Sequence, residues 1–277
     1  MSDAPLLGYA ARSSFLHSLT GTSKLLLTIC LLAGSIISFD TRFLALELCV
    51  SLLMFFFSGM RLRDFSLILW LLAVLMLLNN LLIFLFAPGY GSELYGTRHL
   101  LLTGPGGWDI TSEQLFYQLN VTLKYFAVMP PVVLFIATTQ PSELAASLNR
   151  LGLPYRISYA VALTLRYIPD VQRDFHTISQ AQQARGLDIS RKAPLRARLR
   201  NGAGILFPLL LGSFDRIEVA STAMELRGFG RGKRRTWYSV RPLRLADWLV
   251  IAAGVGMVLL ALWLLHVNGS RFYNPFL

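Results

Sequence analysis

Charged residues are scarce in this chain of 277 residues. Asp, Glu, Lys and Arg make up only 15% of it, whereas 54% of the residues are hydrophobic and the mean hydropathy is +0.53. About a quarter of an ordinary soluble domain is charged. The composition therefore excludes an ordinary soluble domain of this size and predicts an integral membrane protein. The first 23 residues hold no long apolar run, and no small-x-small cleavage site follows the first one, so we expect no cleaved signal peptide.

Residues that carry chemistry are few and dispersed. Cys30 and Cys49 both fall inside apolar runs without CxxC spacing, which favours packing roles over a disulfide or a metal site. No two of the four histidines have the i, i+4 spacing of a metal pair. These histidines are His17, His99, His176 and His266. The sequence therefore predicts no metal site.

Nucleotide and acyl-transfer motifs are also missing. The glycine-rich stretches GFGRG and GPGG lack the Walker pattern and do not follow predicted strands, so the chain is not expected to hydrolyse ATP itself. No nucleophile elbow and no pair of intramembrane carboxylates occurs. We therefore predict no catalytic residue and no cofactor bound by this chain.

The positive charge is confined to one block. Residues 140–244 contain 18 Lys and Arg against 7 Asp and Glu, a net +11, while the remaining 8 basic and 8 acidic residues cancel. Lys and Arg accumulate in the cytoplasmic segments of membrane proteins. The aromatic residues that a single-strand nucleic-acid binder interleaves with its charges are missing from the block. The block is therefore predicted to be cytoplasmic and not to bind nucleic acid.

Five apolar segments predict an all-α, polytopic membrane protein. They cover residues 25–39, 43–58, 66–87, 119–138 and 247–267. The first is short, so we expect it to extend back toward Leu19, with Lys24 snorkelling to the interface. Residues 88–118, rich in Gly and Pro and poor in Lys and Arg, are expected to form an outer loop with aromatic residues at the interface. These are Tyr90, Tyr95 and Trp108.

Two polar features interrupt the spans. Glu47 lies near the outer end of the second span, where a carboxylate is either interfacial or functional, and the sequence leaves both readings open. Asn79 and Asn80 interrupt the third span. Their amides are expected to form hydrogen bonds with neighbouring helices.

The basic block has a helical pattern of its own. Pro141 at a first helical position, and Gly152 followed by Pro154, delimit a short helix. Apolar residues then recur at steps of three and four over 157–178 and 206–224, which predicts two long amphipathic helices joined by the basic connector at 191–200. The predicted organisation is a membrane domain of four transmembrane helices (1–139), a cytoplasmic domain (140–245), and a final transmembrane helix with a short tail (246–277).

Both long helices end in the same way. SQAQQARGLD (179–188) and STAMELRGFG (221–230) each read as a helix tail, with a cation in the last turn and a glycine that closes the helix. One tip of this kind is an ordinary capped, solvated helix end. Two in one basic block suggest that Arg185 and Arg227 insert into sockets on a partner protein.

Several motifs, in this order, resemble a known family. LHSLTGTSKLL precedes the first span, TTQPSELAASLNRLGLP follows the fourth, and LRYIPDVQRD, AQQARG and AMELRGFG come after it. From about His17 to the last span, this pattern resembles the transmembrane T component (EcfT/CbiQ-like) of energy-coupling factor (ECF) ABC transporters.

The resemblance implies a non-catalytic scaffold in the inner cell membrane of a prokaryote. It would join two cytoplasmic ABC ATPases, which hydrolyse the ATP, to a small substrate-binding membrane subunit, the S component, for uptake of a vitamin or a transition-metal ion. The two long helices would be coupling helices whose end motifs dock into grooves on the ATPases. Carried over, these motifs are Ala184, Arg185 and Gly186, and Leu226, Arg227 and Gly228.

Two other functions stay open from the residues alone. A self-contained secondary transporter or channel needs polar or ionisable groups that converge at mid-membrane, and only Asn79 and Asn80 come near that. An integral membrane enzyme needs a nucleophile, a metal set or an acid pair. Gentle purification would distinguish these functions from a T component, because only a T component should co-purify with ATPase subunits.

The charge asymmetry makes the topology testable. We expect the N-terminus and the basic block to be cytoplasmic, and residues 88–118 and the C-terminus to be outside. A cysteine introduced by Ser92→Cys should react with a membrane-impermeant maleimide in intact cells. Reaction only after the membrane has been opened would contradict this topology.

Overall fold

The computed structural model describes residues 14–61, 65–104, 109–186, 194–232, 236–237 and 241–276. Trp108, expected at the membrane interface, lies outside the described residues. Contacts divide the chain into two compact units. The first, Met1–Gln140 with Arg241–Leu277, is called the membrane unit here, and the second is Pro141–Val240.

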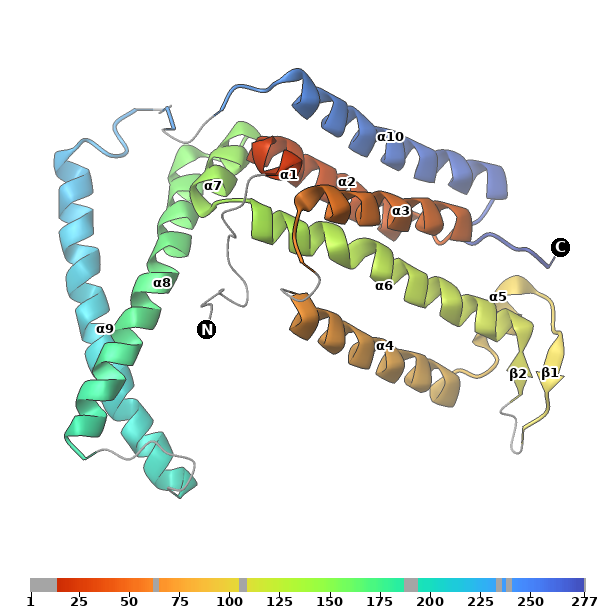
Figure 1. Cartoon of the computed structure of the whole chain (residues 1–277), viewed down its shortest axis with the longest axis horizontal. Coiled ribbons are helices and arrows are strands. Elements are labelled where there is room, and N and C mark those ends of the chain that lie inside the picture. The colour runs from red at the N-terminus through yellow and green to blue at the C-terminus, as the bar shows by residue number, and fades with distance from the viewer. Residues whose placement is uncertain are drawn as a thin grey trace. The chain divides into compact units, whose positions relative to one another are not determined.

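The membrane unit is a bundle of helices with a small two-stranded β-hairpin at one end (Figure 1). Its elements are α1 (Phe15–Ser18), α2 (Gly21–Ile37), α3 (Thr41–Ser58), α4 (Ser66–Phe86), α5 (Tyr90–Tyr95), β1 (Leu100–Leu102), β2 (Ile110–Thr111), α6 (Ser112–Thr138) and α10 (Leu245–Asn268). Within the described residues, four helices, α3, α4, α6 and α10, are long and apolar enough to cross a membrane. α2 is also apolar, and its 17 residues are at the short end of the spanning range. The predicted all-α, polytopic membrane fold is confirmed.

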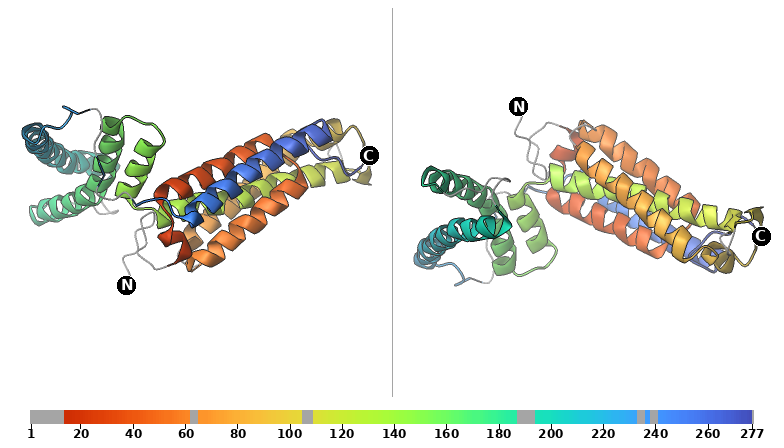
Figure 2. Two further views of the ribbon diagram at one scale, coloured as in Figure 1. Left: turned by 90° about the horizontal axis from the view of Figure 1, so that it is seen from above. Right: turned by 90° about the horizontal axis from the view of Figure 1, so that it is seen from below.

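Two tight helix pairs make the core of the membrane unit. α2 packs along α10, and α3 packs along α6 (Figure 2). The largest buried cluster joins α2, α3 and α10 through Leu27, Leu31, Phe43, Leu44, Met257, Ala261 and Leu264. A Cβ atom on Gly34 would lie 2.7 Å from Cζ of Phe43, so the absence of a side chain at Gly34 lets this ring pack against α2. On α10, Gly254 similarly allows close contact with Cys30 and Leu27.

A buried carboxylate joins the starts of α2 and α10. Asp247, only 1% exposed, accepts hydrogen bonds from Thr20 N (2.8 Å), Thr20 Oγ1 (3.0 Å) and Ser23 Oγ (2.7 Å). Its second oxygen accepts from Arg244 N at 2.8 Å and so caps its own helix. The first backbone N–H groups of a helix have no partner within the helix, so a single side chain here satisfies donors at two helix starts.

The structure corrects several expectations about polar and aromatic residues. Lys24 does not snorkel: it is 4% exposed, and its Nζ donates to Thr138 O at the end of α6 (2.9 Å). Tyr95 is also buried, packed against Phe116, Phe272 and Phe276.

On α3, the structure places Glu47, for which the sequence left two readings open, and corrects the expectation for Cys49. Glu47 is fully buried within the helix packing, where its Oε2 accepts from Ser35 Oγ at 2.5 Å. Cys49 is exposed, so a packing role holds only for Cys30, which is half-buried.

The second unit contains α7 (Pro141–Arg150), α8 (Tyr155–Ala184) and α9 (Leu195–Leu226). These are the predicted short helix and the two predicted long helices. α9 begins at Leu195, within the stretch that was expected to be a connector. It also continues through Pro208. α8 likewise continues through Pro169.

The shared cap at Asp247 can be tested by mutation. Asp247→Ala should lower the free energy of unfolding by about 2–4 kcal/mol, because buried donors at two helix starts lose their acceptor. Glu93→Ala is the control, since Glu93 is exposed on α5 and its loss should change stability by less than about 0.5 kcal/mol. Denaturant unfolding in detergent would measure both variants. Equal stability of the two would show that the cap is dispensable.

Candidate coupling interface

The first arginine tip is the C-terminus of α8. The helix ends at Ala184, and Arg185 is its C-cap residue. Arg185 N donates to Gln182 O at 3.1 Å, and Gly186 N donates to Gln183 O at 2.9 Å. Gly186 has φ of +87°, the left-handed conformation that closes a helix at little cost only in glycine. The Arg185 side chain is exposed at this end.

The second tip, at the end of α9, repeats this geometry. Arg227 is the C-cap, and Gly228 has φ of +67°. Gly228 N donates to Glu225 O and Phe229 N donates to Met224 O, both at 2.9 Å. These two bonds constitute a Schellman motif. Leu226 is 84% exposed, and Arg227 is also exposed. The predicted helix ends are therefore confirmed.

The two tips lie at opposite ends of the helix pair. α8 and α9 run antiparallel (Figure 1), with Asp174 Oδ2 accepting from Arg216 Nη2 at 2.5 Å. The segment after Arg227 contacts the beginning of α8, where Arg156 Nη2 donates to Gly230 O at 2.8 Å. Arg185 is at the other end of the same helix. Because α8 has 30 residues, the tips are about 45 Å apart along its axis.

The apolar faces of α8 and α9 are only partly used within the unit. Several members of the two predicted apolar stripes are exposed. These are Ile157, Ile168, Val171, Phe175, Leu206, Leu210 and Ile217. Phe207 and Phe214 on α9 are also exposed, by 66% and 64%. The pair thus presents an apolar surface that could be covered by another protein or by lipid.

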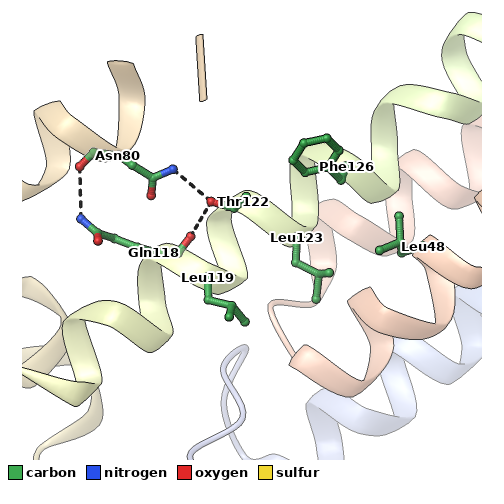
Figure 3. A pocket seen from close by; sticks show the side chains of 7 residues that line it. All are labelled: Leu48, Asn80, Gln118, Leu119, Thr122, Leu123 and Phe126. Atoms are coloured by element: carbon green, nitrogen blue, oxygen red, sulfur yellow. Dashed lines mark hydrogen bonds between the residues drawn. The ribbon is translucent and has the colours of Figure 1, made fainter. Parts of the chain in front are cut away.

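A groove of about 470 Å³ opens between α3, α4 and α6 in the membrane unit (Figure 3). Asn80 Nδ2 donates to Thr122 Oγ1 at 3.0 Å, and Gln118 Nε2 donates to Asn80 O at 3.1 Å. The expected bond from Asn80 to a neighbouring helix is confirmed, whereas the buried Oδ1 of Asn79 has no hydrogen-bond partner. The other lining residues are Leu48, Leu119, Leu123 and Phe126. No ionisable group therefore converges on this groove within the described part of the chain.

Among the residues that the structure describes, no three His, Cys, Asp or Glu side chains are grouped so that they could hold a metal ion.

Comparison with known proteins identifies the family. A family model described as cobalt transport protein, CbiQ, matches residues 12–238. The chain belongs to the CbiQ family. A relative from Exiguobacterium sibiricum is 30% identical over 265 residues, covering 92% of this chain and 94% of that protein. A second, from Streptococcus equi subsp. equi, is 28% identical over 258 residues, covering 90% and 92%. Both are named energy-coupling factor transporter transmembrane protein EcfT.

Membership of the CbiQ family confirms the resemblance inferred from the motifs. The chain is a T component of the ECF transporter type and a multi-pass membrane protein. Both arginine tips fall within the matched residues 12–238. The sequence analysis did not identify the residues that surround the second tip. The sequence feature that could have pointed to them is Phe229, which stands between the two glycines of GFG.

The left-handed glycine at the second tip has a measurable consequence. Gly228→Ala should destabilise the protein by about 1 kcal/mol, because a side chain disfavours positive φ. Gly212→Ala is the matched control: Gly212 lies inside α9 with nothing within 4 Å of an added Cβ, so alanine should stabilise the helix by about 0.5–1 kcal/mol. Thermal unfolding of both variants would test this. A Gly228→Ala variant that is as stable as the control would contradict the need for glycine.

Proposed function

We propose that this chain is the non-catalytic scaffold of an ATP-driven ECF importer. Two cytoplasmic ABC ATPases would dock on the motifs 184–186 and 226–228, and a small substrate-binding S component would sit beside the scaffold in the membrane. The complex would import a vitamin or a transition-metal ion, chosen by the S component. The observation that carries this proposal is the pair of exposed arginine tips at opposite ends of one antiparallel helix pair.

The separation of the tips favours two docking partners. Sites about 45 Å apart along α8 are too distant for one small groove, so each tip would engage its own ATPase. An arginine offers five donors in a planar fork, which suits a carboxylate in a groove on the ATPase. ATP would be bound and hydrolysed in those subunits. No cofactor is proposed for this chain.

The exposed apolar face of α8 and α9 supports a second contact, with the S component. Phe207, Phe214 and Ile217 on α9 are each more than half exposed, and a group of large exposed apolar residues marks a surface for contact with protein or membrane. A helix pair held at both ends by ATPases would move as a unit when they close. The S component resting on its apolar face would then be displaced.

The proposed location is the inner membrane of a prokaryotic cell, with the 141–240 unit in the cytoplasm. The net charge of +11 over residues 140–244 motivates this orientation. For the labelling test of topology, Glu93 is a better site than Ser92. Ser92 is half-buried and its hydroxyl donates to Thr111 Oγ1 at 3.2 Å, whereas Glu93 is exposed.

Mutation of the tips tests the docking role. Arg185→Ala and Arg227→Ala should each weaken ATPase docking by about 2–5 kcal/mol, because a partly buried carboxylate on the ATPase would lose its partner. The double variant should abolish uptake, and lysine at either site should restore less than full function. Co-purification of the ATPases and uptake would be measured in the same membranes.

Arg173→Ala is the control for loss of a positive charge on α8. Arg173 is an exposed arginine 3.5 Å from Asp170, within the helix and away from its tip. Its loss should leave assembly and uptake nearly unchanged. Normal assembly and uptake in the double variant of Arg185 and Arg227 would show that these arginines are only helix caps.

A further inference from the structure

The chain that leaves the second tip turns back onto the start of α8. The Phe229 ring lies 4.8 Å from the ring of Tyr159 and 5.6 Å from that of Tyr155, measured between centroids. These distances are typical of favourable aromatic pairs. Arg156, between the two tyrosines in sequence, donates from Nη2 to Gly230 O at 2.8 Å. Phe229 and Gly230 are therefore both attached to one turn of α8.

A second aromatic residue extends this attachment to α7. The Trp237 ring is 6.4 Å from that of Tyr159, and its Nε1 donates to Asn149 Oδ1 at 3.0 Å. Asn149 lies in the last turn of α7. We call the group Tyr155, Arg156, Tyr159, Phe229 and Trp237 the aromatic latch. It joins α7, the first turns of α8 and the segment after α9.

The backbone conformation explains why the latch restricts Arg227. Gly228 and Gly230 both have positive φ, +67° and +89°, so a residue in the left-handed conformation stands on each side of Phe229. Only Gly228 separates Arg227 from the residue that packs between the tyrosines. A residue so close to a fixed ring has few backbone conformations available.

We propose that the aromatic latch positions Arg227 for docking, with Phe229 and Arg156 as the positioning residues. The inference rests on the proposed function, in which Arg227 enters a groove on an ATPase. Without the latch, the end of α9 could fray, and docking would then have to order it. With the latch, the tip is ordered before the ATPase arrives. The latch would also carry movement of that ATPase directly to α7 and to the start of α8.

A simpler role for the same contacts is to stabilise the 141–240 unit without influencing Arg227. The two roles differ in how mutations combine. A positioning residue acts through Arg227, so its loss should not weaken ATPase docking further once Arg227 has been removed. If the residue only stabilises the unit, its loss should weaken ATPase docking by the same factor whether Arg227 is present or not.

The experiment uses the full-length chain in complex with its S component, titrated with purified ATPases. We expect Phe229→Ala to weaken docking about tenfold and Phe229→Tyr to retain it, because the tyrosine ring keeps the aromatic contacts. Arg227→Ala should weaken docking more, and the double variant should bind no more weakly than Arg227→Ala alone. Phe86→Ala is the control, since Phe86 is an 83% exposed ring at the end of α4, outside the latch and outside the apolar face of α8 and α9, and it should leave ATPase affinity unchanged.

Arg156→Gln provides a gentler variant if Phe229→Ala proves unstable in thermal unfolding. It removes the hydrogen bond to Gly230 O but leaves all four rings, and it should weaken docking severalfold. If Arg227→Ala weakens docking but neither latch variant does, the latch proposal is wrong while the docking proposal stands. If the effects of Phe229→Ala and Arg227→Ala multiply, positioning is also refuted. If Arg227→Ala itself has no effect, the proposed docking role of this tip fails.

Discussion

The ends of helices impose the constraint on which this structure depends. Each helix start leaves backbone N–H groups without partners, and inside a bilayer water cannot supply them. In the membrane unit, buried carboxylates accept hydrogen bonds from these N–H groups. Asp247 serves the starts of both α2 and α10, and Asp40 caps α3 while also accepting from Asn268 Nδ2 at 2.7 Å. These side chains join segments far apart in sequence, so capping the helices also assembles the bundle.

The same constraint is met differently at the ends of α8 and α9. Their last carbonyl groups are satisfied by backbone N–H groups, with a left-handed glycine making the turn. Such a cap does not require an arginine. Arg185 and Arg227 suit the negative end of a helix dipole, and the proposed docking on partner subunits would give both residues a further role. The tips are about 45 Å apart along α8, which would keep the two proposed ATPases separate.

Force transmission through this unit would depend on how well each tip is attached to the rest. α8 and α9 contact each other through polar groups such as Asp174 and Arg216, while large apolar side chains on α9 remain exposed. This exposed apolar face would be available to the proposed S component. The aromatic latch then makes the second tip part of the body formed by α7 and α8, so that movement at Arg227 would not be lost in a frayed helix end.

Local physics determined much of this protein from the sequence alone. The long apolar runs, the period of three and four residues in α8 and α9, and the Arg-Gly ends predicted the helices and both tips, because helix formation and capping depend on neighbouring residues. Contacts between distant segments could not be read in this way. Lys24, Glu47 and Tyr95 were expected at interfaces or left open, yet all three are buried, because partners on other helices satisfy or surround them. Only the tertiary structure decided that α8 and α9 run antiparallel, and so that the tips lie at opposite ends and Phe229 meets Tyr159.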